Sequence, residues 1–179
     1  MAEAEIREYA KAKGFHPQTI ARWISWNPAD SFALERLVFA LKVSENHLRD
    51  LLDWLEELAL RDQIAIHKIL ASKTIDDIAT DPRLGRADRL KKIKEQIRRL
   101  RYPRLAETED ALRGKIQELK LHPGIRISVS PGLEGGQIRV EFTADNHDEL
   151  RRLANKLTDA ADHQLMPEIF QLLSGQSNK

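Results

Sequence analysis

The hydrophobic period of the chain changes once, at the turn sequence of residues 122–124, and this change restricts the fold most. Before the turn, apolar residues recur every three to four positions, as they do in amphipathic helices. After it, apolar and polar residues alternate through 125–129 and again through 138–142. Such alternation is typical of strands with one buried face. We therefore predict an α+β fold, mainly α, with one two-stranded antiparallel hairpin.

The helical pattern and its breaks predict four segments. Residues 1–79 form a helical domain, 80–104 a basic helical connector, 105–174 an αββα module and 175–179 a frayed tail. Asn27 and Pro28 are expected to end the second helix, and Asp30 or Ser31 to cap the third. The module's second helix is expected to start at Asn146, which with Glu149 resembles a capping box.

Charge is distributed unevenly along the chain, although the net charge is only +1. Residues 83–104 hold ten basic and two acidic side chains, and only Glu95 interrupts the outer face of the predicted helix. Such a block is typical of a surface that meets an anion. Nucleic acid, an acidic protein and a merely solvated face all remain open, whereas the lack of inserting aromatics disfavours a membrane. The phosphate-contact candidates are Arg86, Arg89, Lys91, Lys92, Lys94, Arg98, Arg99 and Arg101.

Residues 6–26 have the spacing of a helix-turn-helix. Ala10 permits close packing, Gly14 turns the chain, and Ile20 and Trp23 are expected to bury the second helix. The segment resembles the helix-turn-helix of phage-repressor-like and MerR-like regulators. The resemblance implies contacts to DNA from the start of the second helix. A plain helical hairpin is the alternative. The base-edge candidates are His16, Gln18, Thr19 and Arg22.

A second stretch, residues 37–52, also looks like a repressor turn followed by a recognition helix. Lys42 stands where such turns usually have glycine, and a leucine-rich stripe follows it. Both features favour a helix that builds the core. The sequence leaves open which of the two stretches would read DNA.

A lone two-stranded hairpin is marginally stable, so its free edge is expected to pair with a second copy of the chain. Residues 105–160, with Leu-Ala-Glu-Thr-Glu-Asp-Ala-Leu before the strands and Asp-Glu-Leu-Arg-Arg-Leu after them, resemble the C-terminal dimerisation domain of ParB-family chromosome partition proteins. That resemblance implies a DNA-bridging homodimer. The family's arginine-rich nucleotide-binding half is missing, which argues against its clamp cycle. The dimer-interface candidates are Ile125, Ile127, Val129, Ile138, Val140 and Phe142.

Chemistry-bearing motifs are scarce, so we expect no catalysis, cofactor or metal. The chain has no cysteine, and its six histidines include no pair at helical ligand spacing. The glycines of 132–136 lack the lysine and helix of a phosphate loop and predict a hairpin turn. Acids open the sequence where a signal peptide would be basic, which favours a cytoplasmic location, on the nucleoid if DNA is bound.

Together these patterns predict a non-catalytic homodimer that binds duplex DNA, with a regulatory, nucleoid-organising or partition-like role. The alternative is a protein-interaction adaptor. In that hypothesis the basic face binds an acidic protein, and Trp23, Trp26 or Trp54 is offered to the partner.

Overall fold

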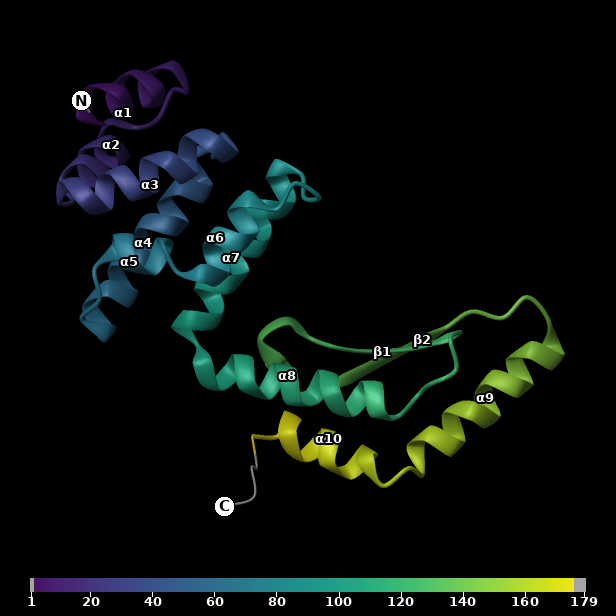
Figure 1. The fold of residues 1–179 in the computed structure, drawn as a ribbon. Coiled ribbons are helices and arrows are strands. Elements are labelled where there is room, and N and C mark those ends of the chain that lie inside the picture. Colours follow the sequence, from purple (N-terminus) through teal and green to yellow (C-terminus); the bar gives the residue numbers. More distant parts are fainter. Residues whose placement is uncertain (1, 176–179) are drawn as a thin grey trace. The chain divides into compact units, whose positions relative to one another are not determined.

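A computed structural model describes residues 2–175 and divides the chain into two units that meet between Tyr102 and Pro103. Helices dominate, and the described strands form one two-stranded antiparallel sheet (Figure 1). The predicted mainly α, α+β class is confirmed. The expected tail, residues 175–179, lies outside the described residues apart from Gly175.

The described part of the first unit is built from helices alone. Their amphipathic sequences place one apolar face of each helix against its neighbours. The helices are α1 (Ala2–Ala12), α2 (Pro17–Ile24), α3 (Pro28–Leu41), α4 (Glu45–Asp62), α5 (Ile66–Leu70), α6 (Lys73–Thr80) and α7 (Arg86–Arg101).

The start of α3 differs from the prediction. Asn27 and Pro28 begin this helix, and neither Asp30 nor Ser31 is its N-cap. The Asn27 side chain accepts a hydrogen bond from the Asp30 backbone N–H at 3.0 Å. Pro28 fits the first helical position, where no N–H is needed and its fixed φ is already helical. The dipeptide expected to end one helix therefore starts the next.

One core serves the whole first unit, including α7. Trp23 and the leucine stripe of α4 are fully buried, and α7 adds Leu90, Ile93 and Ile97 to the same cluster. Leu100, expected to continue the α7 stripe, is 37% exposed. Residues predicted as a helical domain and a separate connector thus share one core as far as Tyr102.

The second unit combines helices with the predicted hairpin. The strands β1 (Ile125–Val129) and β2 (Ile138–Phe142) pair with Ile127 opposite Val140. The loop between them contains Gly132 and Gly135 at φ values of 70° and 82°. Only glycine adopts such angles without strain. The elements are α8 (Pro103–Glu118), β1 (Ile125–Val129), the 3-10 segment η1 (Pro131–Gly136), β2 (Ile138–Phe142), α9 (His147–Ala161) and α10 (Leu165–Leu173).

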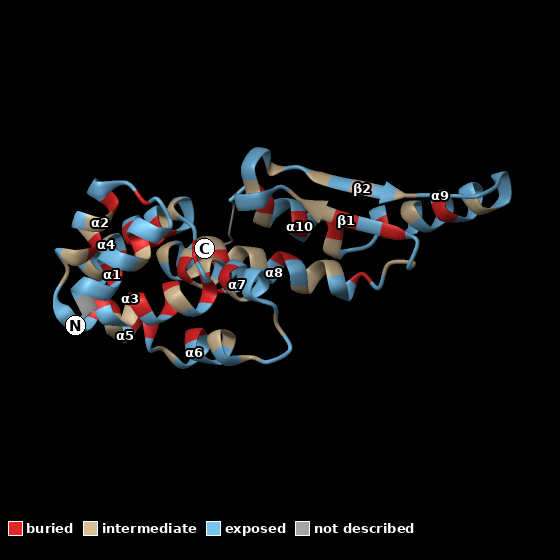
Figure 2. Ribbon diagram, turned by 90° about the horizontal axis from the view of Figure 1, so that it is seen from above, coloured by how far each residue is buried: buried red, intermediate tan, exposed pale blue. Residues whose placement is uncertain are grey.

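The apolar face of the hairpin packs on helices of its own unit. Ile127 joins Leu112 and Leu119 from the α8 side and Met166 and Ile169 from α10 in one cluster. β1 is buried more deeply than β2, as the colours of the two strands show in Figure 2. The hairpin is therefore covered unevenly within the chain.

Asn146 caps α9 as predicted, and its side chain accepts a hydrogen bond from the Glu149 N–H at 2.9 Å. The reciprocal bond of a capping box is displaced by one residue. Glu149 accepts from the backbone N–H of Asp145, also at 2.9 Å, where a capping box would use the N-cap residue itself.

Candidate nucleic-acid interface

Two of the four base-edge candidates lie exposed at the start of α2. His16 is its N-cap, and its Nδ1 accepts a hydrogen bond from the Gln18 backbone N–H at 3.3 Å. Gln18 lies in the first turn of α2 and is also exposed. Both side chains stand at the end of the helix that the helix-turn-helix interpretation turns toward DNA.

The other two candidates are held inside the unit by acids of α4. Thr19 is buried, and its hydroxyl donates to Glu45 Oε1 at 2.7 Å. This bond, together with one from the His16 backbone N–H, lowers the pKa of Glu45. Arg22 binds Asp53 at 2.5 Å and Glu56 at 2.6 Å. α2 therefore uses its cation for packing on α4, and its exposed surface is uncharged.

α4 also supplies acids to the basic helix α7. Lys94 donates to Asp50 at 2.6 Å and lies 4.9 Å from the centre of the Trp54 ring. The Arg101 guanidinium lies 5.3 Å from the centre of the same ring and pairs with Glu57. From the sequence we predict a basic face with almost no acid partner, because that prediction counts only the acids within the basic segment itself. The partners come from a helix some forty residues earlier in the chain.

Some of the remaining candidates on α7 bind to groups of their own unit, and others are exposed. Arg89 donates to the Asp81 backbone oxygen at 3.1 Å, and Arg98 pairs with Glu95 at 2.8 Å on its own helix. Arg99 is partly exposed. In contrast, Arg86, Lys91 and Lys92 are exposed and form no ion pair within residues 2–175. The cations available to an outside anion thus concentrate in the N-terminal half of α7.

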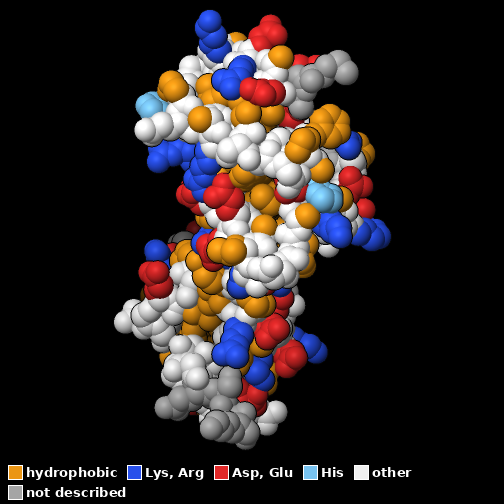
Figure 3. Space-filling view, turned by 90° about the vertical axis from the view of Figure 1, so that its left-hand side faces the viewer, with side chains coloured by type: hydrophobic (Ala, Val, Ile, Leu, Met, Phe, Trp, Pro, Cys, Tyr) orange, Lys and Arg blue, Asp and Glu red, His pale blue; other side chains and the backbone are white. Residues whose placement is uncertain are grey.

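Charge compensation is visible on the surface. On the face drawn in Figure 3, basic and acidic side chains stand next to one another, and no broad region of a single sign forms. Acidic neighbours therefore balance much of the basic block, through the ion pairs of Lys94, Arg98 and Arg101. An anion-binding surface has to be smaller than the full basic block.

The second helix-turn-helix-like stretch is formed by α3 and α4. Lys42 closes α3 in the left-handed conformation, with φ 52° and ψ 47°, although it lacks the freedom of glycine. Val43 is buried beneath the turn. The first turns of α4 expose Asn46, His47 and Arg49. Sequence reasoning left these three out because the lysine at the turn argued against the motif.

The dimer-interface candidates all lie on the hairpin. Ile125 and Ile127 are buried at 5% and 9% exposure against their own unit. The three candidates on β2 are half-buried, as is Val129. Their side chains are therefore partly occupied within the chain, and β2 keeps more exposed apolar surface than β1. The candidates on β2 are Ile138, Val140 and Phe142.

The three tryptophans that the adaptor hypothesis offers to a partner differ in their exposure. Trp23 is fully buried, as the helix-turn-helix interpretation expected, and so it is not offered to a partner as the adaptor hypothesis had it. Trp26 is half-buried and donates to Glu56 at 2.7 Å, and Trp54 lies beneath Lys94 and Arg101. All three belong to the packing around α4.

Within the described range, no group of three or more His, Asp or Glu side chains is arranged to hold a metal ion. No helix between residues 2 and 175 has the length and apolarity needed to cross a bilayer. The exposed cations of α7 and the polar first turns of α2 and α4 are groups suited to binding an anionic or polar partner.

Comparison with protein-family models, with curated proteins and with solved structures gave no match to this chain.

Proposed function

We propose that the protein is a non-catalytic homodimer that binds duplex DNA through the first unit. The observation that carries this proposal is the division of α7 into two halves. Its C-terminal half is fixed to α4, whereas Arg86, Lys91 and Lys92 form no ion pair with a described acid. Cations of this kind bind phosphates by releasing condensed counterions.

The neighbouring surface favours α4 over α2 as the helix that meets base edges. Lys94 bridges Asp50 and His47 Nδ1, at 2.6 and 3.2 Å, so α7 runs beside the N-terminal half of α4. The helix that carries the exposed cations therefore passes beside the polar start of α4. Asn46 and Arg49 there are side chains of the kind that read adenine and guanine. The exposed end of α2 offers no comparable cation.

The second unit supports a dimer through the outer edge of β2. Antiparallel pairing of β2 with its copy about a two-fold axis at Val140 matches all five residues. Arg139 then faces Glu141 of the second copy, and Ile138 faces Phe142 on the apolar side. Both cross-strand combinations are favourable. The same pairing gives the half-exposed apolar residues of β2 cross-strand neighbours from the second copy.

The proposal is tested by measuring binding to random-sequence duplex DNA across a salt series. We expect affinity to fall steeply with salt, and the slope of log K against log salt to decrease by about 0.9 for each phosphate that a variant no longer neutralises. The test variant is Lys91→Ala with Lys92→Ala. The matched control is Lys11→Ala with Lys68→Ala, two lysines on α1 and α5.

A smaller slope in the test variant and an unchanged slope in the control would support the proposal. Absence of binding at low salt would refute it. In that case an acidic protein becomes the better candidate partner for the same α7 cations, because such a partner uses the same charges.

A further inference from the structure

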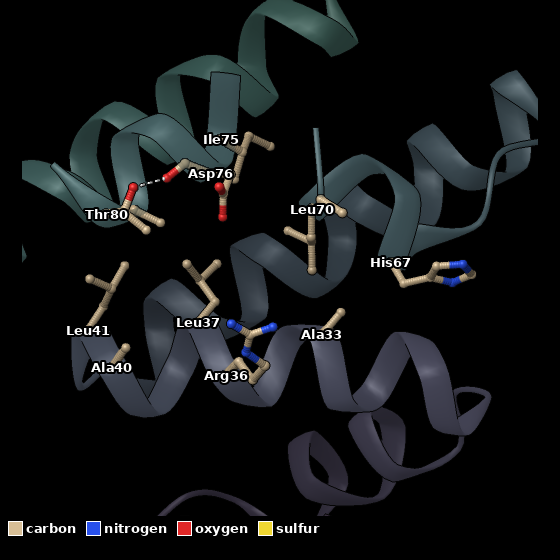
Figure 4. A pocket seen from close by; sticks show the side chains of 12 residues that line it. Ala33, Arg36, Leu37, Ala40, Leu41, His67, Leu70, Ile75, Asp76 and Thr80 are labelled. Atoms are coloured by element: carbon tan, nitrogen blue, oxygen red, sulfur yellow. Dashed lines mark hydrogen bonds between the residues drawn. The ribbon is translucent and has the colours of Figure 1, made fainter. Parts of the chain in front are cut away.

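A cavity of about 580 Å³ opens between α3, α5 and α6, separate from the proposed DNA surface (Figure 4). Cavities of roughly 300–1,000 Å³ are the size class that holds small ligands in proteins. The apolar walls come from Leu37 and Leu41 of α3, Leu70 of α5 and Ile75 of α6. The cavity therefore has both the volume and the lining of a small-molecule site.

The apolar walls belong to the core of the first unit. Ile75 is 2% exposed and Leu37, Leu41 and Leu70 are at most 9% exposed, so each is packed from behind. All four belong to the unit's main cluster. A ligand entering this cavity meets walls that are already in place and does not have to order them. Such pre-formed walls reduce the entropic cost of binding.

Two opposite charges face the cavity from opposite walls. Arg36 extends from α3 toward α6, and the Asp76 carboxylate extends from α6 toward α3 (Figure 4). Both side chains are exposed, and neither forms an ion pair with any described residue. The Thr80 hydroxyl donates to the backbone oxygen of Asp76 at 2.8 Å, so this hydrogen bond does not involve the Asp76 carboxylate. The cavity therefore presents one cation, one anion and an apolar floor.

We infer that this cavity binds a small zwitterion with an apolar side chain, of the class of free apolar amino acids. The ligand carboxylate pairs with the Arg36 guanidinium, which binds carboxylates through two parallel hydrogen bonds. The ligand ammonium pairs with Asp76. Its side chain lies against Leu37 and Leu70. A ligand with a single charge leaves one of the two protein charges unpaired beside it.

The test is an NMR titration of the full ¹⁵N-labelled chain with L-phenylalanine. The comparison compounds are 3-phenylpropanoate, which lacks the ammonium, and 2-phenylethylamine, which lacks the carboxylate. We expect phenylalanine to shift amide signals of α3 and α6, and each single-charge compound to bind roughly tenfold more weakly, as is usual when one charge-assisted hydrogen bond is removed. Equal affinity for all three compounds, or no shifts with phenylalanine, would overturn the inference.

Variants locate the site. Arg36→Gln and Asp76→Asn are each expected to weaken phenylalanine binding roughly tenfold. The matched controls, Arg151→Gln and Asp77→Asn, change exposed residues outside the cavity lining and are expected to leave phenylalanine binding unchanged. Weakening by the controls to the same extent would also overturn the inference. The measurement contains no DNA, so its result is independent of the proposed function.

Discussion

Asp30 joins two helices of the first unit through a single buried carboxylate. Its Oδ1 accepts hydrogen bonds from the His67 backbone N–H at 2.6 Å and from the His67 ring Nδ1 at 2.7 Å. The Asn27 side-chain amide donates to the other carboxylate oxygen, Oδ2. Burial alone would raise the pKa of Asp30, but the bonds from His67 and Asn27 outweigh it and hold that pKa below its ordinary value. The carboxylate thus ties the start of α3 to the start of α5.

We predict that Asp30→Asn lowers the free energy of unfolding of the first unit by about 1–3 kcal/mol at pH 7, because it removes charged hydrogen bonds to a buried group. Because the pKa of Asp30 is lower in the folded than in the unfolded chain, its carboxylate stabilises the folded state fully at a pH above the unfolded pKa. This contribution disappears as the pH falls through the folded pKa. The difference from the natural chain should therefore shrink toward pH 2. Urea unfolding followed by tryptophan fluorescence reports this, since all three tryptophans lie in the first unit.

The control for this prediction is Asp162→Asn, which changes an exposed aspartate at the end of α9. It should leave the fluorescence-detected unfolding of the first unit unchanged. A constant effect of Asp30→Asn between pH 7 and pH 2 would show that the carboxylate charge contributes nothing.

At the scale of elements, α7 is held to the unit by charge and aromatic contacts as well as by its apolar stripe. The Arg101 side chain is 15% exposed, pairs with Glu57 and stacks on Trp54. Arg101→Ala is therefore expected to cost about 1–2 kcal/mol of stability. Lys91→Ala, on the exposed face, should change stability by less than about 0.5 kcal/mol. Equal effects in urea unfolding would mean that the two halves of α7 do not differ as proposed.

Assigning the base-reading role to α2 or to α4 leads to different predictions about DNA binding. If α4 meets the bases, Asn46→Ala with Arg49→Ala should weaken binding to duplex DNA more than His16→Ala with Gln18→Ala. Removing each base-reading side chain is expected to cost about 1–3 kcal/mol. Fluorescence anisotropy with one labelled duplex at fixed salt measures both pairs. A larger effect of the α2 pair would reverse the assignment, and circular dichroism checks that each variant is folded.

Much of this element order follows from the sequence, because periodicity and local turn chemistry determine it. The hairpin strands lie at the predicted residues, and Asn146 caps α9 as its side chain requires. Lys42 shows where local rules fail. Glycine is usual at a left-handed position, yet the packing of Val43 beneath the turn keeps the lysine there. The acid partners of α7 were beyond sequence reasoning because α4 meets α7 only in the folded chain.

At the scale of the whole molecule, the two strands of the hairpin are unequally buried. Ile125 and Ile127 of β1 are covered, whereas Ile138, Val140 and Phe142 of β2 are half-exposed. The outer edge of β2 has five residues without proline or lysine, the residues that usually protect an edge from pairing. A second copy at this edge extends the sheet to four strands and pairs the backbone groups that the outer edge of β2 leaves without a strand partner.

The two-fold pairing about Val140 makes a prediction for the polar face. Arg139 contacts Glu141 within its own strand at 2.7 Å, and in the dimer it also faces Glu141 of the second copy. Arg139→Glu places like charges opposite each other twice, once on each side of the axis. Since each such contact is worth about 0.2–1 kcal/mol, the dimer should weaken roughly tenfold. Arg151→Glu, an exposed arginine of α9, makes the same charge change away from β2 and should leave the dissociation constant unchanged. Sedimentation equilibrium measures all three chains. A natural chain that stays monomeric at micromolar concentration, or equal weakening by both variants, would rule out pairing through β2.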